Sequence, residues 1–147
     1  NMRILGIDYG EKRVGLAISS PVGFIAQGLP TIERIDGTDY LEDLADVINE
    51  KEVDEIVVGL PKNMNGSIGE KAEVVLVLVE TLKSKFNLPV HTFDERLTTV
   101  RANRAMAGAK MSKKGKKKRV DMIAAQFILQ AYLDQISRSA EQDWEDE

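Results

Sequence analysis

The first 32 residues contain three apolar segments of strand length that are separated only by short turns. These segments are Arg3–Asp8, Arg13–Ser19 and Phe24–Ile32. Such close spacing is typical of an antiparallel meander, because a parallel connection needs a crossover of a dozen or more residues. The chain is therefore expected to begin with three neighbouring antiparallel strands.

Helical and strand patterns alternate in the rest of the chain. A 3.6-residue apolar period predicts a helix over Asp39–Lys51 with Thr38 as its N-cap, and the apolar run Glu55–Leu60 predicts a buried parallel strand. The same reasoning predicts a strand over Val90–Phe93 and helices over Gly69–Phe86, Thr98 or Thr99 to Ala107, and Val120–Ile136. The order β-β-β-α-β-α-β-α-α predicts an α/β fold with a mixed five-stranded sheet and helices on its faces.

Composition limits the chemistry available to these 147 residues. The chain has no cysteine and one histidine, which excludes thiolate catalysis, disulfides, zinc ribbons and multi-histidine metal sites. It has no apolar run of membrane-spanning length and no signal-peptide pattern, so we expect a cytoplasmic protein without a membrane partner. Carboxylates remain as candidates for catalysis, and His91 is expected to be structural.

The charge is unevenly distributed, although the net charge is only −4. Residues 110–119, KMSKKGKKKR, carry seven of the 20 basic residues and no acid, and we expect them to form a mobile loop. Such a segment predicts contact with nucleic-acid phosphates, which gives affinity but little sequence specificity. A solvated loop without a partner is the alternative. The last seven residues contain five acids, and residues 139–147 are expected to form a disordered acidic tail.

Carboxylates interrupt the apolar pattern at three places. Asp8 ends the first predicted strand, the pair Asp94 and Glu95 follows the last strand, and Asp121 lies in the first turn of the final predicted helix. Because strand ends meet at one edge of an open sheet, these acids can come together there. Oxygen ligands without histidine or cysteine suit Mg²⁺ or Mn²⁺, and two such ions can promote phosphodiester hydrolysis. Each acid also has a structural alternative, as a turn residue, a neighbour of a helix cap or a helix-dipole contact.

The segment GLPKNMNGSIGE at 59–70 is a second candidate for phosphate binding. Its glycines allow close backbone approach, and Lys62, Asn63 and Asn65 supply hydrogen-bond donors ahead of a predicted helix. The segment lacks the GxxxxGK[ST] pattern of a P-loop. An ordinary polar connection is an equally good interpretation.

Four motifs together resemble the YqgF family, which is also called RuvX. They are GIDYGEKRVGLA at 6–17, VVGLPKNMNGSIGE at 57–70, DERLTT at 94–99 and VDMIAAQFILQAYL at 120–133. Members are described as Holliday junction resolvases and as pre-16S ribosomal RNA nucleases. The resemblance implies one nuclease domain over residues 2–138 with a ribonuclease H-like fold, and it leaves the acidic tail outside.

By this resemblance Asp8, Glu95 and Asp121 are catalytic and bind Mg²⁺ or Mn²⁺, with Asp94 as the substitute for Glu95. An acid that related resolvases carry on the central strand has no counterpart here, because this strand ends in Gly59 and Leu60. The motifs, the 59–70 segment and the basic segment together predict these nucleic-acid contacts: Lys12, Arg13, Lys62, Asn63, Asn65, Arg96, Lys113, Lys114, Lys116, Lys117, Lys118 and Arg119.

The implied function is metal-dependent endonucleolytic processing of the 5′ end of pre-16S rRNA, with the small ribosomal subunit as an additional partner to test. A Holliday junction resolvase is the first alternative, and it would suit a two-fold homodimer better than a monomer. The second is a non-catalytic nucleic-acid-binding or ribosome-assembly factor. The third is a phosphotransferase of the actin-like and sugar-kinase type, which shares a GIDxG strand such as Gly6–Gly10 but uses two domains.

Overall fold

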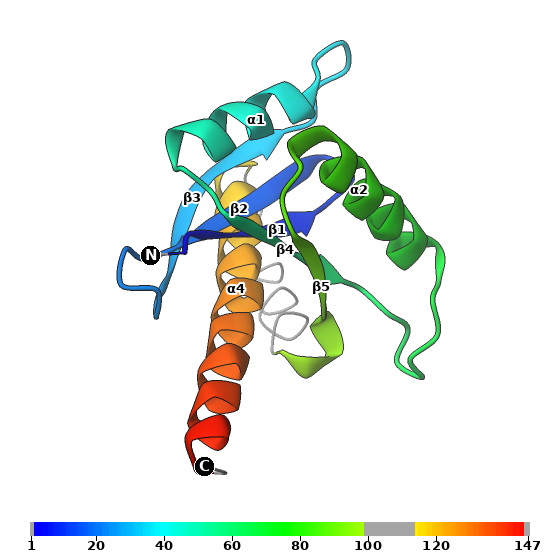
Figure 1. Ribbon diagram of the computed structural model, residues 1–147. Helices are drawn as coiled ribbons and strands as arrows, with labels where there is room; N and C mark the ends of the chain where they lie inside the picture. The colour runs from blue at the N-terminus through cyan, green and yellow to red at the C-terminus, as the bar shows by residue number, and fades with distance from the viewer. Residues whose placement is uncertain (1, 99–113, 146–147) are drawn as a thin grey trace.

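The computed structural model describes residues 2–98 and 114–145 and contains a single five-stranded sheet in that part of the chain. The strand order is β3-β2-β1-β4-β5, in which β2 is antiparallel to β1 and β3 while β4 is parallel to β1 and β5. The predicted mixed α/β sheet is confirmed (Figure 1). The elements in chain order are β1 (Ile4–Tyr9), β2 (Arg13–Ser19), β3 (Ala26–Glu33), α1 (Tyr40–Glu50), β4 (Glu55–Leu60), α2 (Glu70–Phe86), β5 (Val90–Asp94), the 3-10 helix η1 (Glu95–Leu97) and α4 (Lys114–Glu145).

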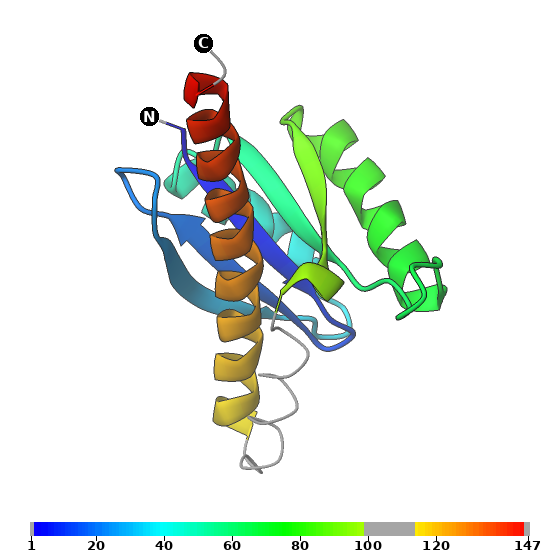
Figure 2. The ribbon, with the colours of Figure 1, turned by 90° about the horizontal axis from the view of Figure 1, so that it is seen from below.

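Helices cover both faces of the sheet. Figures 1 and 2 show α1 and α2 on one face and α4 running across the other. Alternation along the strands separates two cores, because Leu5 and Ile7 of β1 pack under α1 and α2 whereas Ile4 packs under α4. The period of two in β1 also places Asp8 on the α4 side of the sheet.

Glycines on the α4 face of the sheet let this helix approach the strands closely. A Cβ atom added to Gly15 would lie 2.1 Å from the carbonyl oxygen of Asp121, and one added to Gly6 would lie 2.7 Å from Cβ of Leu129. No side chain larger than hydrogen fits at these contacts unless the helix moves. The backbone of α4 therefore rests directly on β1 and β2, and this contact fixes the height of Asp121 above the sheet.

The third strand starts later than predicted. It begins at Ala26 rather than Phe24 and ends at Glu33 rather than Ile32. The preceding turn is closed by a 2.7 Å hydrogen bond from the Ser20 amide to the Ile25 carbonyl, and Phe24 is exposed. Two apolar turn residues were therefore counted as strand.

The first helix has a different N-cap from the predicted one. The Asp39 carboxylate accepts a 2.9 Å hydrogen bond from the Leu41 amide and caps α1. Thr38 is not the cap, because its hydroxyl donates to the Ile35 carbonyl instead. The other internal boundaries of β1, β2, α1, β4, α2 and β5 match the predictions to within one residue, with Gly69 as the N-cap of α2.

The last helix is much longer than the predicted Val120–Ile136, since α4 runs over Lys114–Glu145. Two expectations are therefore wrong within the described residues. Residues 114–119 of the basic segment are helical rather than a loop, and residues 139–145 are helical rather than a disordered tail. Lysine and arginine are good helix formers, so a run of them does not by itself indicate a loop. Beyond Thr98, the C-cap of η1, the predicted helix up to Ala107 lies outside the described residues.

A polar cluster joins α4 to the amino ends of β4 and β5. The Tyr132 hydroxyl donates to Glu55 Oε1 at 2.7 Å, and His91 Nε2 lies 2.8 Å from the same oxygen. The rings of His91 and Tyr132 stack with centroids 6.0 Å apart. Burial, and then the hydrogen bond to Glu55, raises the pKa of Tyr132 above its usual value.

No helix in the described ranges is both long enough and apolar enough to cross a membrane.

We expect Tyr132→Phe to lower the free energy of unfolding by about 1 kcal/mol near neutral pH, because Glu55 loses a hydrogen bond. The folded-state pKa of Tyr132 lies above the unfolded value of about 10. The contribution of the hydroxyl is therefore fully present below that pH and is lost as the pH rises above it. Urea unfolding between about pH 8 and pH 11 should show the wild type losing its advantage over the variant. An advantage that stays constant across this range would contradict the prediction.

Candidate active site

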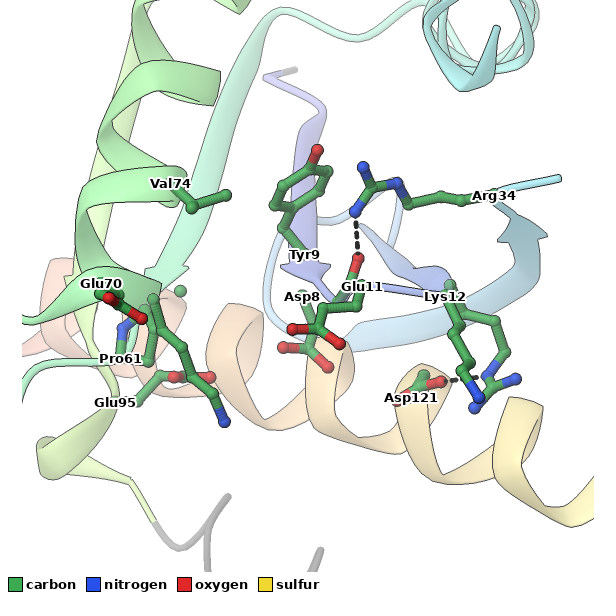
Figure 3. Close-up of a pocket in the computed structure, with 14 residues that line it drawn as sticks. Asp8, Tyr9, Glu11, Lys12, Arg34, Pro61, Glu70, Val74, Glu95 and Asp121 are labelled. Carbon is green, nitrogen blue, oxygen red and sulfur yellow. Dashed lines mark hydrogen bonds and ion pairs between the residues drawn. The ribbon is translucent and has the colours of Figure 1, made fainter. Parts of the chain in front are cut away.

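Three elements bring acidic side chains to one pocket at the carboxyl ends of β1, β4 and β5. Asp8 lies near the end of β1, Glu95 begins η1 and Asp121 belongs to α4, and all three line the pocket (Figure 3). Its volume is about 550 Å³, which falls in the range of ligand-binding sites. Asp8 is only 8% exposed and Glu95 only 3%. The structure thus brings the three predicted acids to one place.

Of the two adjacent acids, Glu95 lies in the pocket. Phe93 packs on the α4 side of the sheet, so the period of two directs Glu95 to that side and Asp94 to the other. Asp94 accepts hydrogen bonds from the Arg96 amide at 2.9 Å and from Arg96 Nη2 at 2.7 Å. The Arg96 guanidinium holds the pKa of Asp94 below its usual value. Asp94 therefore caps η1 and anchors Arg96.

Asp121 occupies a later position in its helix than predicted. It is the eighth residue of α4, which rules out a helix-dipole contact in the first turn. Its Oδ2 atom lies 2.8 Å from Arg13 Nε, and the side chains of Arg13 and Asp121 are 17% and 22% exposed. In Figure 3 the dashed line that ends on Asp121 marks this ion pair. Asp121 thus lines the pocket while its carboxylate is engaged by β2.

The chemical type of the oxygen ligands in the pocket suits a hard divalent cation. Asp8, Glu95 and Asp121 offer carboxylate oxygens, which are the ligands that Mg²⁺ and Mn²⁺ prefer. Gly59 leaves room beside them, since a Cβ atom there would lie 3.2 Å from Glu95 Oε1. Within residues 2–98 and 114–145, however, no three acidic or histidine side chains are already close enough to share one metal ion. In this arrangement one carboxylate oxygen of Asp121 is paired with Arg13.

The pocket also contains charged residues beyond those predicted from the sequence. Glu11 and Glu70 add two carboxylates, and Arg34 and Lys71 add two cations. With the predicted residues, the lining holds five carboxylates and four cations, a formal charge of −1. A bound divalent cation would reverse this sign, so phosphate affinity should depend on metal. Glu11 and Glu70 lie within the first and second motifs, whereas no local pattern marks Arg34 and Lys71.

Arg34 is held at the pocket by the hairpin between β1 and β2. Its Nη1 donates to the Gly10 carbonyl at 2.7 Å, and its backbone amide donates to the Lys12 carbonyl at 2.8 Å. The guanidinium carbon lies 4.6 Å from the ring centre of Tyr9 and 5.2 Å from that of Tyr40, which are cation–π contacts. Burial raises the pKa of Tyr40 above its usual value, and the neutral ring packs against the guanidinium. Arg34 is thus a preorganised cation at the pocket.

The predicted phosphate contacts on the first hairpin reach the pocket, and those on α4 are only partly described. Lys12 and Arg13 both line the pocket. Arg119 is exposed on α4. The structure does not describe the other predicted contacts of the basic segment, which are Lys113 and the side chains of Lys114, Lys116, Lys117 and Lys118.

The polar residues of the 61–69 loop mainly hold the loop itself together. The side-chain oxygen of Asn65 accepts a 3.0 Å hydrogen bond from the Ser67 amide, and the Asn63 side chain donates to the Ser67 hydroxyl at 2.9 Å. Arg96 Nη1 donates to the Met64 carbonyl at 3.3 Å, which joins the loop to η1. Four predicted phosphate contacts are not among the described residues that line the pocket: Lys62, Asn63, Asn65 and Arg96.

Comparison with known proteins identifies the family. A family model described as "RuvX: Holliday junction resolvase" matches residues 2–135. The chain belongs to the RuvX family. Relatives named "Putative pre-16S rRNA nuclease" from Clostridium acetobutylicum and Clostridium botulinum strain Hall share 53% identity over 135 residues and 49% over 137 residues. These matches cover 92% and 93% of this chain and 100% of each relative.

Solved structures agree with the fold of this RuvX family member. Thermus thermophilus RuvC in complex with a Holliday junction substrate has a TM-score of 0.52 at 15% identity, covering 93% of this chain and 97% of that one. The fowlpox virus Holliday junction resolvase also has a TM-score of 0.52 at 14% identity, covering 91% and 99%. The chain therefore has the ribonuclease H-like fold of these resolvases, as the four motifs implied.

Proposed function

We propose that this RuvX protein is a metal-dependent endonuclease that cleaves structured nucleic acid, with the 5′ end of pre-16S rRNA as its substrate in the cytoplasm. The observation that carries the proposal is the meeting of Asp8, Glu95 and Asp121 from β1, η1 and α4 at one pocket. The names of relatives about 50% identical favour the RNA substrate. The family description favours a four-way DNA junction as the second candidate.

In this mechanism Asp8, Glu95 and Asp121 would hold Mg²⁺ or Mn²⁺ through their carboxylate oxygens. Such an ion, when bound, would supply activation of a water molecule and stabilisation of the charge on the leaving 3′-oxygen of a phosphodiester. The near-complete burial of Asp8 and Glu95 strengthens their attraction for a cation. Lys12 and Arg34 bind backbone phosphates at the rim of the pocket and orient the strand that is cut.

The proposal predicts cleavage that depends on a divalent cation. Purified protein is stripped with a chelator and returned to Mg²⁺, Mn²⁺ or buffer alone. Each sample is incubated with a labelled 16S precursor carrying its 5′ leader and with a labelled four-way DNA junction. We expect the precursor to be cut only after metal is restored, because a bound cation would activate the attacking water and offset the negative charge of a polyanionic substrate.

The same assay separates the other functions. Metal-dependent cutting of the junction instead of the precursor would make the protein a resolvase, and sedimentation would then have to show the two-fold dimer that paired cuts require. Salt-sensitive binding without cutting in any metal would indicate a non-catalytic nucleic-acid-binding factor. Co-sedimentation with the small ribosomal subunit would then test whether this factor binds the subunit.

A further inference from the structure

The ion pair between Arg13 and Asp121 engages one of the three candidate metal ligands. Arg13 begins β2, and its Nε lies 2.8 Å from Oδ2 of Asp121 on α4. Both side chains are more than three-quarters buried and both line the pocket. The positive charge of the guanidinium on Oδ2 offsets the negative charge that Asp121 offers to a divalent cation, so each weakens the binding of the other.

The backbone around this pair leaves little freedom except in the side chains. The Asp121 carbonyl sits 2.1 Å from the place where a Cβ atom of Gly15 would lie, so α4 cannot move closer to the sheet there. Arg13 is fixed at its backbone by pairing with Glu33 of β3. The carboxylate can reorient about two side-chain torsions, and the long arginine stem can swing without moving either element.

We propose that Arg13 exchanges partners during the nuclease cycle. It holds Asp121 when no divalent cation is bound, and it binds a phosphate of the nucleic acid once Asp121 turns to the cation. This inference rests on the proposed function. A guanidinium suits both partners, because its planar fork pairs with a carboxylate and with a phosphate in the same way.

The exchange couples metal to substrate. A cation that takes Asp121 releases Arg13 for the substrate, and a substrate phosphate that takes Arg13 releases Asp121 for the cation. By thermodynamic linkage the factor by which metal tightens nucleic-acid binding equals the factor by which nucleic acid tightens metal binding. An arginine that merely tied β2 to α4 would change stability and leave this coupling intact.

The first test measures Mn²⁺ binding by calorimetry without nucleic acid. The wild type is compared with Arg13→Met and with Lys12→Met, which removes one positive charge from the same pocket. We expect Arg13→Met to bind Mn²⁺ about two- to fivefold more tightly than the wild type. This factor corresponds to the free energy that a partly exposed ion pair typically contributes. Lys12→Met should gain clearly less, because no ion pair joins Lys12 to a carboxylate among the described residues.

The second test measures binding of a fully phosphorothioate-substituted 16S leader RNA, which keeps the backbone charge, by fluorescence anisotropy with and without Mn²⁺. The gain in affinity on adding Mn²⁺ should be about two- to fivefold smaller for Arg13→Met than for the wild type. The salt slope of binding measured with Mn²⁺ should fall by about one for the variant, the signature of one lost phosphate contact.

Several results would overturn the proposal. Unchanged or weaker Mn²⁺ binding by Arg13→Met would show that the ion pair does not compete with metal. An equal gain in Mn²⁺ affinity for Lys12→Met would show that the loss of any positive charge from the pocket has the same effect. Absence of Mn²⁺ binding in the wild type and all variants would overturn the proposed function as well. If circular dichroism shows that Arg13→Met does not fold, Arg13→Gln replaces it, with the same expected tightening.

Discussion

Replacing Glu95 with glutamine is expected to lower the rate of metal-dependent cleavage by about 10²–10³-fold, because the loss of a metal ligand removes several kcal/mol of transition-state stabilisation. Asp8→Asn should have an effect of the same size, since both carboxylates are nearly buried in the pocket. Initial rates at saturating substrate, with Mn²⁺ varied, measure this loss. A partial recovery at high Mn²⁺ would identify weakened metal binding as its cause.

Asp94→Asn is the matched control, because it neutralises the adjacent acid without touching the pocket. Asp94 is bound to Arg96 on the opposite side of the strand, and its change should alter cleavage by less than about threefold. Its effect should instead appear at low pH. The pKa of Asp94 is lowered in the folded protein, so its contribution to stability is present above about pH 4 and is lost on acidification. Equal losses of activity in Glu95→Gln and Asp94→Asn would refute the assignment of Glu95.

The choice between these two neighbours illustrates where sequence reasoning stopped. Both acids could be located, because they follow a predicted strand. Their orientation could not be read from the strand itself, because the two apolar residues of β5, Val90 and Phe93, are three positions apart and therefore show no period of two. The side of each acid became clear only from the packing of Phe93 against α4.

The ends of α4 were missed for a related reason. An apolar stripe marks a helix only where it covers a core, and the buried residues of α4 lie between Ala124 and Leu133. Figure 1 shows the helix continuing beyond the sheet toward the C-terminus, where no such stripe is needed. The pattern therefore predicted the packed middle of α4 and left out both of its ends.

Contacts across long sequence separations were beyond any local pattern. The Arg13–Asp121 pair joins residues 108 positions apart, and the Arg34–Gly10 contact spans 24 positions. Each depends on which strands are neighbours and on how deeply α4 sits on them. The sequence could thus predict the charged groups at the pocket more readily than their partners.

The depth of α4 on the sheet leads to the second large effect. Gly15→Ala places a methyl group 2.1 Å from the Asp121 carbonyl oxygen and 2.6 Å from its carbonyl carbon, and both are backbone atoms that cannot rotate away. Alanine is otherwise favoured over glycine in a strand, so any loss of stability reports the clash. We expect a loss of about 3 kcal/mol, the upper part of the range for overpacking, and a fall in Tm of roughly 6–12 °C.

Gly6→Ala is the matched control on the same helix. Its methyl group would meet Cβ of Leu129 at 2.7 Å, two turns of α4 beyond Asp121. Both substitutions push α4 from the sheet and should lower Tm in thermal unfolding, but only Gly15→Ala displaces Asp121 itself. Cleavage by the folded protein, assayed well below both Tm values, should fall at least about tenfold for Gly15→Ala and remain near the wild-type rate for Gly6→Ala, because misplacement of a catalytic group by 1 Å can cost about 10²-fold. Equal activity in the two variants would mean that the contact between Gly15 and Asp121 supports the fold without setting the geometry of the site.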